Sequence, residues 1–449
     1  MKDTFSYVDR NRARFVEKLQ ELLRQPSIST NHKDCAKCAE LLREIMSASG
    51  IEAKLSEVRN GPPVVFGEVR SKSSKRTLLC YDHYDVKPID PVNEWISDAF
   101  GAEIRNNRVY ARGATDNKSG CLAFAFGTEA LLKSTGDVPV NLKFAFEGEE
   151  EVGSTNLEEW ALKNKELLKA DGLVSLDGGV SPETGKPSIG TYGKGVLYVE
   201  LRAKGPKEDI HSGGEAMVVN PIWRIVWALN SIKGPNDEIL VEGWYKDLRQ
   251  PTEEELELVR KESERFDADA AKKRLGTPTF AGNRESYDML VHRRFWGTAA
   301  ICGIHGGYTK VGLHTIVPKT AFAKIDFRCP PNLDPDIQFT KLRRHLDLHG
   351  FSDIELVKIS SRGNAWVTDR EEPIVQAVRR AIRIAYPDAR ISEKGTAEGV
   401  FRVKLGIPSV MSSFANDDNN LHAPNENCDL EHYIQGIKYA ATIMTEFAK

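Results

Sequence analysis

The sequence lacks the features that mark membrane-spanning and secreted proteins. None of its apolar runs reaches the roughly 18 residues that a membrane-spanning helix needs. The first residues, Met1–Ser6, contain no apolar core of the kind that a signal peptide has. The seven cysteines are odd in number and scattered, which argues against a disulfide framework. We therefore expect a cytoplasmic protein with reduced thiols and no membrane partner.

An excess of one charge sign is also missing. Lys plus Arg number 62 and Asp plus Glu number 65, so the formal net charge is −3. Because no general basic field exists to hold nucleic-acid phosphates, we expect no nucleic-acid partner. The 449 residues, 40% hydrophobic and 28% charged, are enough for two or three globular domains, or for one large domain with an insertion.

The spacing of apolar residues indicates how the chain is organised. Helical spacing over residues 6–25, ended by Pro26, predicts a first helix. Short β-rich runs then alternate with apolar helical stretches, which is typical of an α/β layered sheet. The strand-like runs lie at about 52–58, 64–70, 77–81, 109–111, 141–146 and 172–176, and the helical stretches at about 34–49, 119–134 and 157–168.

The pattern changes near residue 196 and returns near residue 364. A strand of exposed type is expected at 196–205, and a long charged stretch at 235–295 follows. The segment 315–331 alternates apolar and polar residues over its length, as a half-buried strand of an antiparallel sheet does. We predict an α/β domain made of residues 1–196 and 364–449, interrupted by an inserted α+β domain of residues 197–363.

Metal-ligand residue types gather in five short segments. Four of them directly follow strand-like runs, and ligands collect beyond the carboxyl ends of strands in α/β sheets. The segments are Asp82–Asp85, Asp116–Lys118, Glu147–Glu151, Leu176–Gly179 and His422–Glu426.

Each segment alone has an ordinary explanation. In His83-Tyr84-Asp85 the two polar side chains share one side of an extended segment, so Asp85 could orient the imidazole for a metal. A histidine satisfied in a loop beside a carboxylate would look the same. The acidic run Glu149–Glu151 could be a solvated face, and Asp116 or Asp177 could be an aspartate of a turn.

Taken together, the motifs resemble the M20 metallopeptidase family, most closely its cytosolic nonspecific dipeptidase and carnosinase branch. The resemblance extends over nearly the whole chain and follows the family's order. It rests on the segments 81–95, 109–120, 146–154, 175–179, 209–214, 314–331, 393–399 and 422–426. It implies a three-layer α/β catalytic domain with a mixed sheet and an inserted α+β lid that forms a homodimer.

The resemblance also implies two divalent metal ions per subunit. Asp116 would bridge both ions, His83 and Asp177 would complete one site, and Glu151 and His422 would complete the other. The peptide bond between Asp116 and Asn117 is often cis in this family. Histidine and carboxylate ligands without cysteine suit Zn²⁺, Mn²⁺ or Co²⁺, and of these we expect Zn²⁺.

The implied reaction is hydrolysis of the peptide bond in dipeptides or short peptides with a free carboxylate. A hydroxide shared by the two metals would attack, Glu150 would be the general base, and Asp85 would orient His83. The alternatives are an N-acyl-amino-acid amidohydrolase or a carboxypeptidase of the same family. A more remote alternative is a noncatalytic metal-binding protein that keeps the fold.

Further roles come from the same resemblance. His211 of the partner subunit would donate to the developing oxyanion, and Thr315 would also come from the partner subunit. Arg328 and Thr396 would hold the carboxylate of the substrate. Two plainer readings stay open, a surface-loop role for His211 and a structural ion pair for Arg328.

The chain departs from the family pattern at several positions. Asp82 stands where glycine is common, and Ser119 interrupts the common Lys-Gly pair after the bridging aspartate. The region around Lys194 and the Gly213-Gly214 turn is about one residue shorter than the pattern and lacks its aromatic residue before the glycine pair. Cys35 and Cys38 fall on a predicted helix, where core packing explains them better than a metal site does.

Overall fold

The computed structural model describes most of the chain. It covers residues 1–178, 180, 185–362, 365–387, 389, 393–396 and 399–449, without the side chains at 274, 362 and 393–396. The chain divides into two compact units. The first unit comprises Met1–Tyr192, Thr368–Thr396 and Val400–Lys449, and the second consists chiefly of Gly193–Val367.

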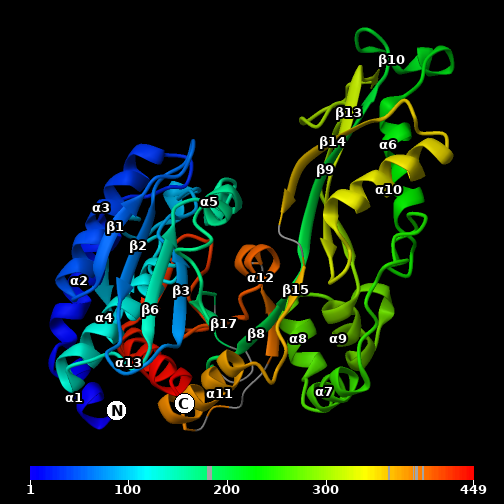
Figure 1. Ribbon diagram of the computed structural model, residues 1–449. Helices are drawn as coiled ribbons and strands as arrows, with labels where there is room; N and C mark the ends of the chain where they lie inside the picture. Colours follow the sequence, from blue (N-terminus) through cyan, green and yellow to red (C-terminus); the bar gives the residue numbers. More distant parts are fainter. Residues whose placement is uncertain (179, 181–184, 363–364, 388, 390–392, 397–398) are drawn as a thin grey trace. The chain divides into compact units, whose positions relative to one another are not determined.

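A large mixed sheet forms the centre of the first unit (Figure 1). Its strands β6, β3, β7 and β17 run parallel, so their carboxyl ends meet at one edge. The spatial order is β1 (Glu52–Ser56), β2 (Val64–Val69), β6 (Asn141–Glu147), β3 (Thr77–His83), β7 (Gly172–Leu176), β17 (Ser409–Ser412) and β8 (Ile189–Gly193).

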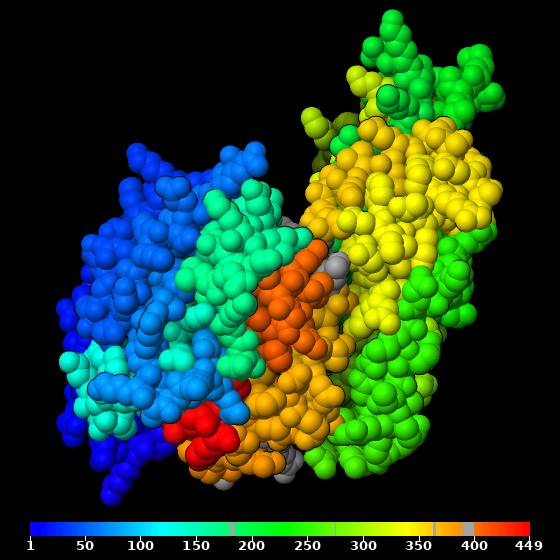
Figure 2. Space-filling model, viewed as in Figure 1, coloured from blue at the N-terminus to red at the C-terminus, as the bar shows by residue number. Residues whose placement is uncertain are grey.

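Side chains along each strand alternate between the two faces of the sheet, and helices cover both faces, which gives three layers. In β3, Leu78 and Cys80 belong to one hydrophobic cluster, whereas Leu79 and Tyr81 belong to another on the opposite face. The first cluster contains residues of α1 (Lys2–Arg10), α2 (Arg12–Arg24), α3 (His32–Ala48), α4 (Lys118–Thr135), α11 (Pro373–Ala385) and α13 (Leu430–Phe447). The second contains residues of α5 (Leu157–Lys163) and α12 (Val400–Leu405), which lie side by side (Figure 2). The predicted fold class is confirmed.

The helix expected over residues 6–25 is two helices. α1 ends at Arg10 and α2 begins at Arg12, with Asn11 between them at φ −101° and ψ 9°. The apolar spacing did not reveal the break because Val8 and Phe15 are both buried in the same core. Cys35 and Cys38 are buried in that core on α3, as expected, and all seven cysteines of the chain are free.

The second unit contains an antiparallel sheet. Its order is β11 (Thr298–Gly306), β13 (Thr320–Cys329), β9 (Gly195–Lys204) and β14 (Glu355–Arg362). Residues of α6 (Pro221–Ile232) and α10 (Pro335–Leu348) share one hydrophobic cluster with this sheet. Along β13 every second side chain is buried, as the alternating sequence predicts.

The single strand expected at 315–331 is divided in two. β12 (Ile316–Val317) pairs with β10 (Ile210–His211) in a separate two-stranded ribbon, and β13 begins at Thr320. Pro318 lies between them and has no N–H for a strand ladder, which accounts for the break. The charged stretch at 235–295 forms mainly the helices α7 (Glu253–Ser263), α8 (Ala268–Leu275) and α9 (Ser286–Phe295).

None of the helices in the described ranges is long and apolar enough to cross a membrane.

Candidate metal centre

The candidate ligands of the first unit lie where the sheet topology places strand ends together. His83 is the last residue of β3, and Asp177 directly follows β7, its parallel neighbour. Glu151 follows β6 by four positions, in a short 3-10 helix at Glu150–Val152. Asp116 lies just before α4, and His422 lies in the loop between β17 and β18 (Asn427–Asp429). Five distant segments therefore bring side chains to one edge.

Two groups of side chains in the described part of the chain could each hold a metal ion. One consists of His83, Asp116 and Asp177, and the other of Asp116, Glu151 and His422. Within each group the ligand atoms all lie within 4.8 Å of one another. Asp116 belongs to both groups, so a carboxylate common to two ion positions is geometrically possible.

The two oxygens of Asp116 face different histidines. Oδ1 lies 3.0 Å from Nε2 of His83, and Oδ2 lies 2.8 Å from Nε2 of His422. Asp177 approaches the first pair, with its Oδ2 at 3.9 Å from Nε2 of His83. Glu151 approaches the second, with Oε2 at 3.4 Å from Nε2 of His422. The peptide bond between Asp116 and Asn117 is cis, as the resemblance implied.

The electrostatics of this cluster suit added positive charge. Burial and the charge of Asp116 raise the pKa of Asp177 well above its usual range. Burial also opposes ionisation of Asp116, but hydrogen bonds from His422 and His83 hold its pKa well below the usual value. Oε1 of Glu151 is buried, and none of the described residues gives it a hydrogen bond. Divalent cations would balance these carboxylates and use that free oxygen, so the donor set fits them.

Asp85 supports both His83 and the acidic turn. Nδ1 of His83 lies 3.1 Å from the backbone carbonyl of Asp85 and 3.4 Å from its Oδ1. The carboxylate of Asp85 also accepts the backbone N–H groups of Glu150 and Glu151, each at 3.1 Å, and the hydroxyl of Ser29 at 2.7 Å. The sequence suggested only the contact with the imidazole. Backbone contacts of this kind leave no residue pattern that could have revealed them.

The acidic run after β6 is not a solvated face. Glu149 and Glu151 are buried, at 5% and 7% exposure, and Glu149 accepts hydrogen bonds from Asn156. Glu147 accepts hydrogen bonds from Tyr81 and Ser154, and burial raises its pKa to about 8. Glu150 keeps a side chain that is 19% exposed, with Oε2 3.9 Å from Nε2 of His83. It therefore combines partial access to solvent with closeness to the ligand cluster.

A further supporting residue, Glu426, had no role assigned from the sequence. Its Oε1 accepts the backbone N–H groups of Gly113, Thr115 and Asp116 at 3.1, 2.9 and 3.1 Å. Glu426 thus ties the turn that carries Asp116 to the loop that carries His422. The segment HAPNE at 422–426 contained the signal, but the partners are backbone groups some 310 positions away.

Three of the remaining predicted residues lie in the second unit, and Thr396 belongs to the first. His211 and Thr315 are exposed neighbours on the ribbon of β10 and β12, where the N–H of Ser212 donates to the carbonyl of Thr315 at 2.9 Å. Arg328 lies near the end of β13, and its Nη2 is 2.9 Å from Oδ2 of Asp326, so the structural ion pair is present. The backbone of Thr396 ends β16 (Glu393–Thr396), but its side chain lies outside the described residues.

The fold and the cluster are those of a two-domain α/β metalloenzyme, with candidate ligands near the carboxyl ends of the strands and in two neighbouring loops. Residues 79–446 match the family described as Peptidase family M20/M25/M40. The chain therefore belongs to the M20 peptidases and is a metallopeptidase by family, as the motifs predicted.

Several known proteins are similar over almost their whole length. A solved M20 family metallo-carboxypeptidase, Sso-CP2 from Sulfolobus solfataricus, is 35% identical, with a TM-score of 0.89 over 97% of this chain and 99% of that one. The Cys-Gly metallodipeptidase dug1 of Schizosaccharomyces pombe is 27% identical over 99% of this chain and 98% of its own. The human Beta-Ala-His dipeptidase is 26% identical over 100% of this chain and 93% of its own.

Proposed function

We propose that this metallopeptidase holds two divalent cations and hydrolyses the peptide bond of dipeptides or short peptides with a free carboxylate. The observation that carries the proposal is the pair of ligand groups that share Asp116. The two ions would be bound by His83 and Asp177 on one side and by Glu151 and His422 on the other. Similarity to a Cys-Gly metallodipeptidase and a Beta-Ala-His dipeptidase supports dipeptides as the substrate class.

The chain's own residues have distinct roles in this proposal. When bound, two divalent cations would polarise the carbonyl of the substrate and make a water molecule easier to deprotonate. Glu150 takes up the proton from the attacking water and returns it to the leaving amine. The carboxylate of Asp85 accepts the backbone N–H of Glu150, and the backbone carbonyl of Asp85 pairs with Nδ1 of His83. These contacts hold Glu150 at a fixed distance from the ligand cluster.

His211 is suited to donate to the oxyanion. Its Nδ1 accepts the N–H of Gly213 at 3.1 Å, and this hydrogen bond selects the neutral tautomer that carries its proton on Nε2. Nε2–H is then a donor on an exposed side chain. Thr315 lies beside it on the same ribbon and would reach the substrate together with it.

The geometry of the second unit favours action across a homodimer. β13 runs from Thr320, which follows the ribbon of His211 and Thr315, to Arg328, and these eight residues span about 26 Å at the usual rise of a strand. A dipeptide is at most about 7 Å long. Because the length of β13 separates Arg328 from the ribbon, we propose that His211 and Thr315 act on the site of the partner subunit. Arg328 and Thr396 would bind the carboxylate of the substrate in their own chain.

A second candidate function is removal of a carboxyl-terminal residue from longer peptides. The 35% identity to a metallo-carboxypeptidase over almost the whole of both chains favours it. Both activities need a site for a free carboxylate, and they differ in whether a longer amino-terminal part of the substrate can be accommodated. Cleavage of acetylated amino acids would indicate the third member of this set, an amidohydrolase.

The decisive experiment is a substrate panel with controlled metal content. The enzyme is stripped with a chelator, restored with Zn²⁺, Mn²⁺ or Co²⁺, and assayed with free dipeptides, tripeptides, longer peptides and acetylated amino acids. We expect dipeptides to be cleaved fastest. We also expect Zn²⁺ to be the ion that the protein holds. Preferred cleavage of longer peptides would establish the carboxypeptidase instead. Failure with every substrate and every ion would leave the noncatalytic metal-binding protein.

We also propose a cytoplasmic location. Its support is that all seven cysteines are free, which suits a reducing compartment. Fractionation of the cells that express the protein tests this directly.

A further inference from the structure

Asp82, which the resemblance marked as a departure, joins two strands at the edge of the candidate metal centre. It is the residue before His83 in β3, and it is 0% exposed. Its Oδ1 accepts two hydrogen bonds from the neighbouring strand β7, from the hydroxyl of Ser175 at 2.9 Å and from the N–H of Leu176 at 3.0 Å. Ser175 and Leu176 are the last two residues of β7, directly before Asp177.

The position of these hydrogen bonds along the strands matters. The register pairs of β3 and β7 run from Leu78 with Gly172 to Cys80 with Val174. The bonds to Asp82 come one and two residues further along β7, towards its carboxyl end. Beyond the last register pair, Oδ1 of Asp82 therefore connects the two strands. The candidate ligands His83 and Asp177 lie at this same end of the strands. These two ligands belong to the first ion position alone.

A third segment is fitted around the same carboxylate. Gly120 lies in the first turn of α4, four residues after Asp116. A Cβ at Gly120 would lie 2.7 Å from Oδ2 of Asp82 and 2.2 Å from Oδ1 of Asn117, closer than side-chain contacts allow. Only glycine leaves room at this position for the carboxylate. The turn that carries Asp116 therefore packs directly on Asp82.

We propose that Asp82 is a positioning residue that sets the spacing of the ion site formed by His83, Asp116 and Asp177. Asp82 belongs to neither of the two groups of candidate ligands, and its Oδ1 is already engaged by β7. The inference rests on the proposed dinuclear function and adds to it the residue that fixes one of the two ion positions. The second position shares only Asp116 with the first, and its other two ligands, Glu151 and His422, come from segments that make none of these contacts. Loss of Asp82 should therefore affect the two ions unequally.

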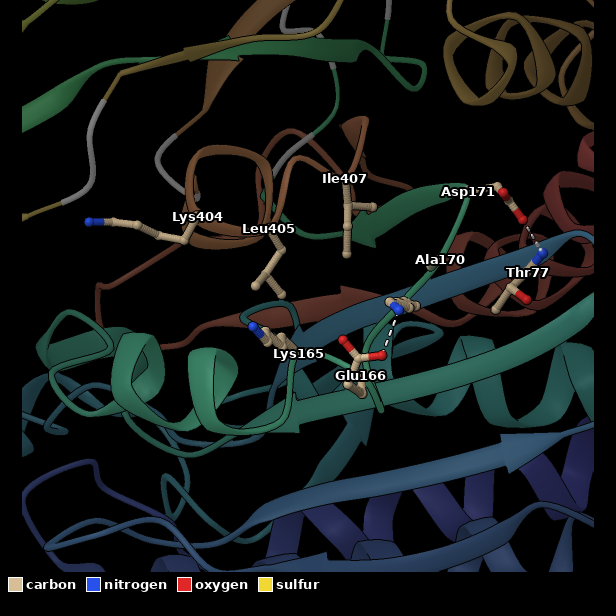
Figure 3. A pocket seen from close by; sticks show the side chains of 9 residues that line it. Thr77, Lys165, Glu166, Ala170, Asp171, Lys404, Leu405 and Ile407 are labelled. Carbon is tan, nitrogen blue, oxygen red and sulfur yellow. Dashed lines mark hydrogen bonds and ion pairs between the residues drawn. The ribbon is translucent and has the colours of Figure 1, made fainter.

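The opposite ends of the same strands provide a matched control. There the carboxylate of Asp171, the residue before β7, accepts the N–H of Thr77 at 2.7 Å (Figure 3). This pair borders a hollow of about 490 Å³ that also contains Lys165 and Lys404. Asp171 thus connects β3 to β7 by the same chemistry, but at the end away from the ligands. Asp171 is exposed, so Asp171→Ala shows whether losing a carboxylate contact between these two strands is enough by itself to change ion binding.

The test measures ion binding by the full-length protein. Chelator-stripped wild type, Asp82→Ala, Asp82→Asn and Asp171→Ala are titrated calorimetrically with Zn²⁺, and the visible absorption spectrum is recorded with Co²⁺. We expect wild type and Asp171→Ala to bind two ions. Asp82→Ala should keep one tight ion, bind the other at least about tenfold more weakly, and show an altered Co²⁺ spectrum. Asp82→Asn, which keeps an acceptor oxygen, should restore most of the affinity.

Each outcome bears on the proposal. Two equally tight ions in a folded Asp82→Ala protein would overturn it, and so would equal losses in Asp82→Ala and Asp171→Ala. If Asp82→Ala does not fold, Ser175→Ala replaces it, because it removes one of the two hydrogen bonds to Oδ1 of Asp82 and leaves the carboxylate in place, and a smaller unequal loss is expected. A wild type that binds two ions but cleaves no peptide would refute the proposed function and leave the role of Asp82 testable by the titration alone.

Discussion

Arg112 and Glu426 form an enclosed ion pair beside the candidate metal centre. Nη1 of Arg112 lies 2.6 Å from Oε2 of Glu426, and the two side chains are 1% and 0% exposed. The other oxygen of Glu426 receives the backbone N–H groups of the turn that carries Asp116. An uncompensated charge in such a place is costly, so the pair has to remain intact for the turn to keep its position.

Glu426→Gln should therefore destabilise the protein strongly. It leaves the guanidinium of Arg112 buried without a counter-charge, a change that typically costs about 3 to 5 kcal/mol. Urea denaturation followed by fluorescence measures the change. The control is Arg108→Gln, which breaks the pair of Arg108 and Asp418 at 2.8 Å, whose side chains are 27% and 60% exposed, and should cost no more than about 1 kcal/mol. Similar losses in both variants would contradict the prediction.

Glu150→Gln should stop turnover while both ions stay bound. An amide cannot accept the proton of the attacking water, and general base catalysis is worth about 100-fold to 10,000-fold in rate. Steady-state kinetics and metal analysis of the same preparation test the two halves of the prediction. The control is Glu149→Gln. Because Glu149 accepts a hydrogen bond from Asn156, this variant should keep a rate near that of the wild type. Near-normal activity of Glu150→Gln would show that another group is the base.

Asp116→Asn and His422→Ala should differ in how many ions they lose. Asp116 belongs to both ligand groups, whereas His422 belongs to one. We expect the first variant to weaken the binding of both ions and the second to weaken only one. Atomic absorption after dialysis against a buffered Zn²⁺ concentration gives the number of ions per chain. Loss of a single ion in Asp116→Asn would show that this carboxylate does not bridge.

Mixing two inactive chains should restore activity if His211 acts across a dimer. A Glu150→Gln chain still supplies His211, and a His211→Ala chain still supplies Glu150. When the two are unfolded together and refolded in equal amounts, half of the dimers are mixed, and each mixed dimer has one complete site of two. The expected rate is about a quarter of the wild-type rate. If the mixture is no more active than its parts, His211 does not act on the partner's site.

Lys194 should make the stability of the protein depend on pH above neutrality. Burial, together with the charges of Arg293 and Arg328, lowers the pKa of Lys194 from 10.5 to about 8. Between these values the unfolded chain binds more protons than the folded one, so the free energy of unfolding receives a contribution that rises with pH. Below pH 8 the penalty for burying the charge is present in full.

The comparison of wild type with Lys194→Met tests this dependence. The methionine removes the titrating group, so the difference in unfolding midpoint between the two proteins should change steadily from about pH 8 to pH 10.5. Urea titrations across this range give the difference curve. Parallel curves for the two proteins would show that Lys194 titrates normally in the folded state.

The sequence alone determined the layered architecture and the chemical nature of the candidate site. Alternating burial in β3 and the long helical stretches are local consequences of where apolar residues stand, so the fold class followed from the pattern. The ligand types could be read directly, because side-chain chemistry does not change on folding. The division of the expected first helix at Asn11 could not be read, since the apolar spacing continues on both sides of it.

Only the tertiary structure decided what surrounds those ligands. Asp82 contacts Ser175 and Leu176 across a gap of some 93 positions, and Glu426 contacts the turn at Asp116 across 310. Backbone N–H groups are identical in every residue except proline, so no pattern of side chains announces which of them a carboxylate will meet. The identity of the candidate groups can thus be read from the sequence, whereas their spacing depends on contacts that form only when distant strands lie together.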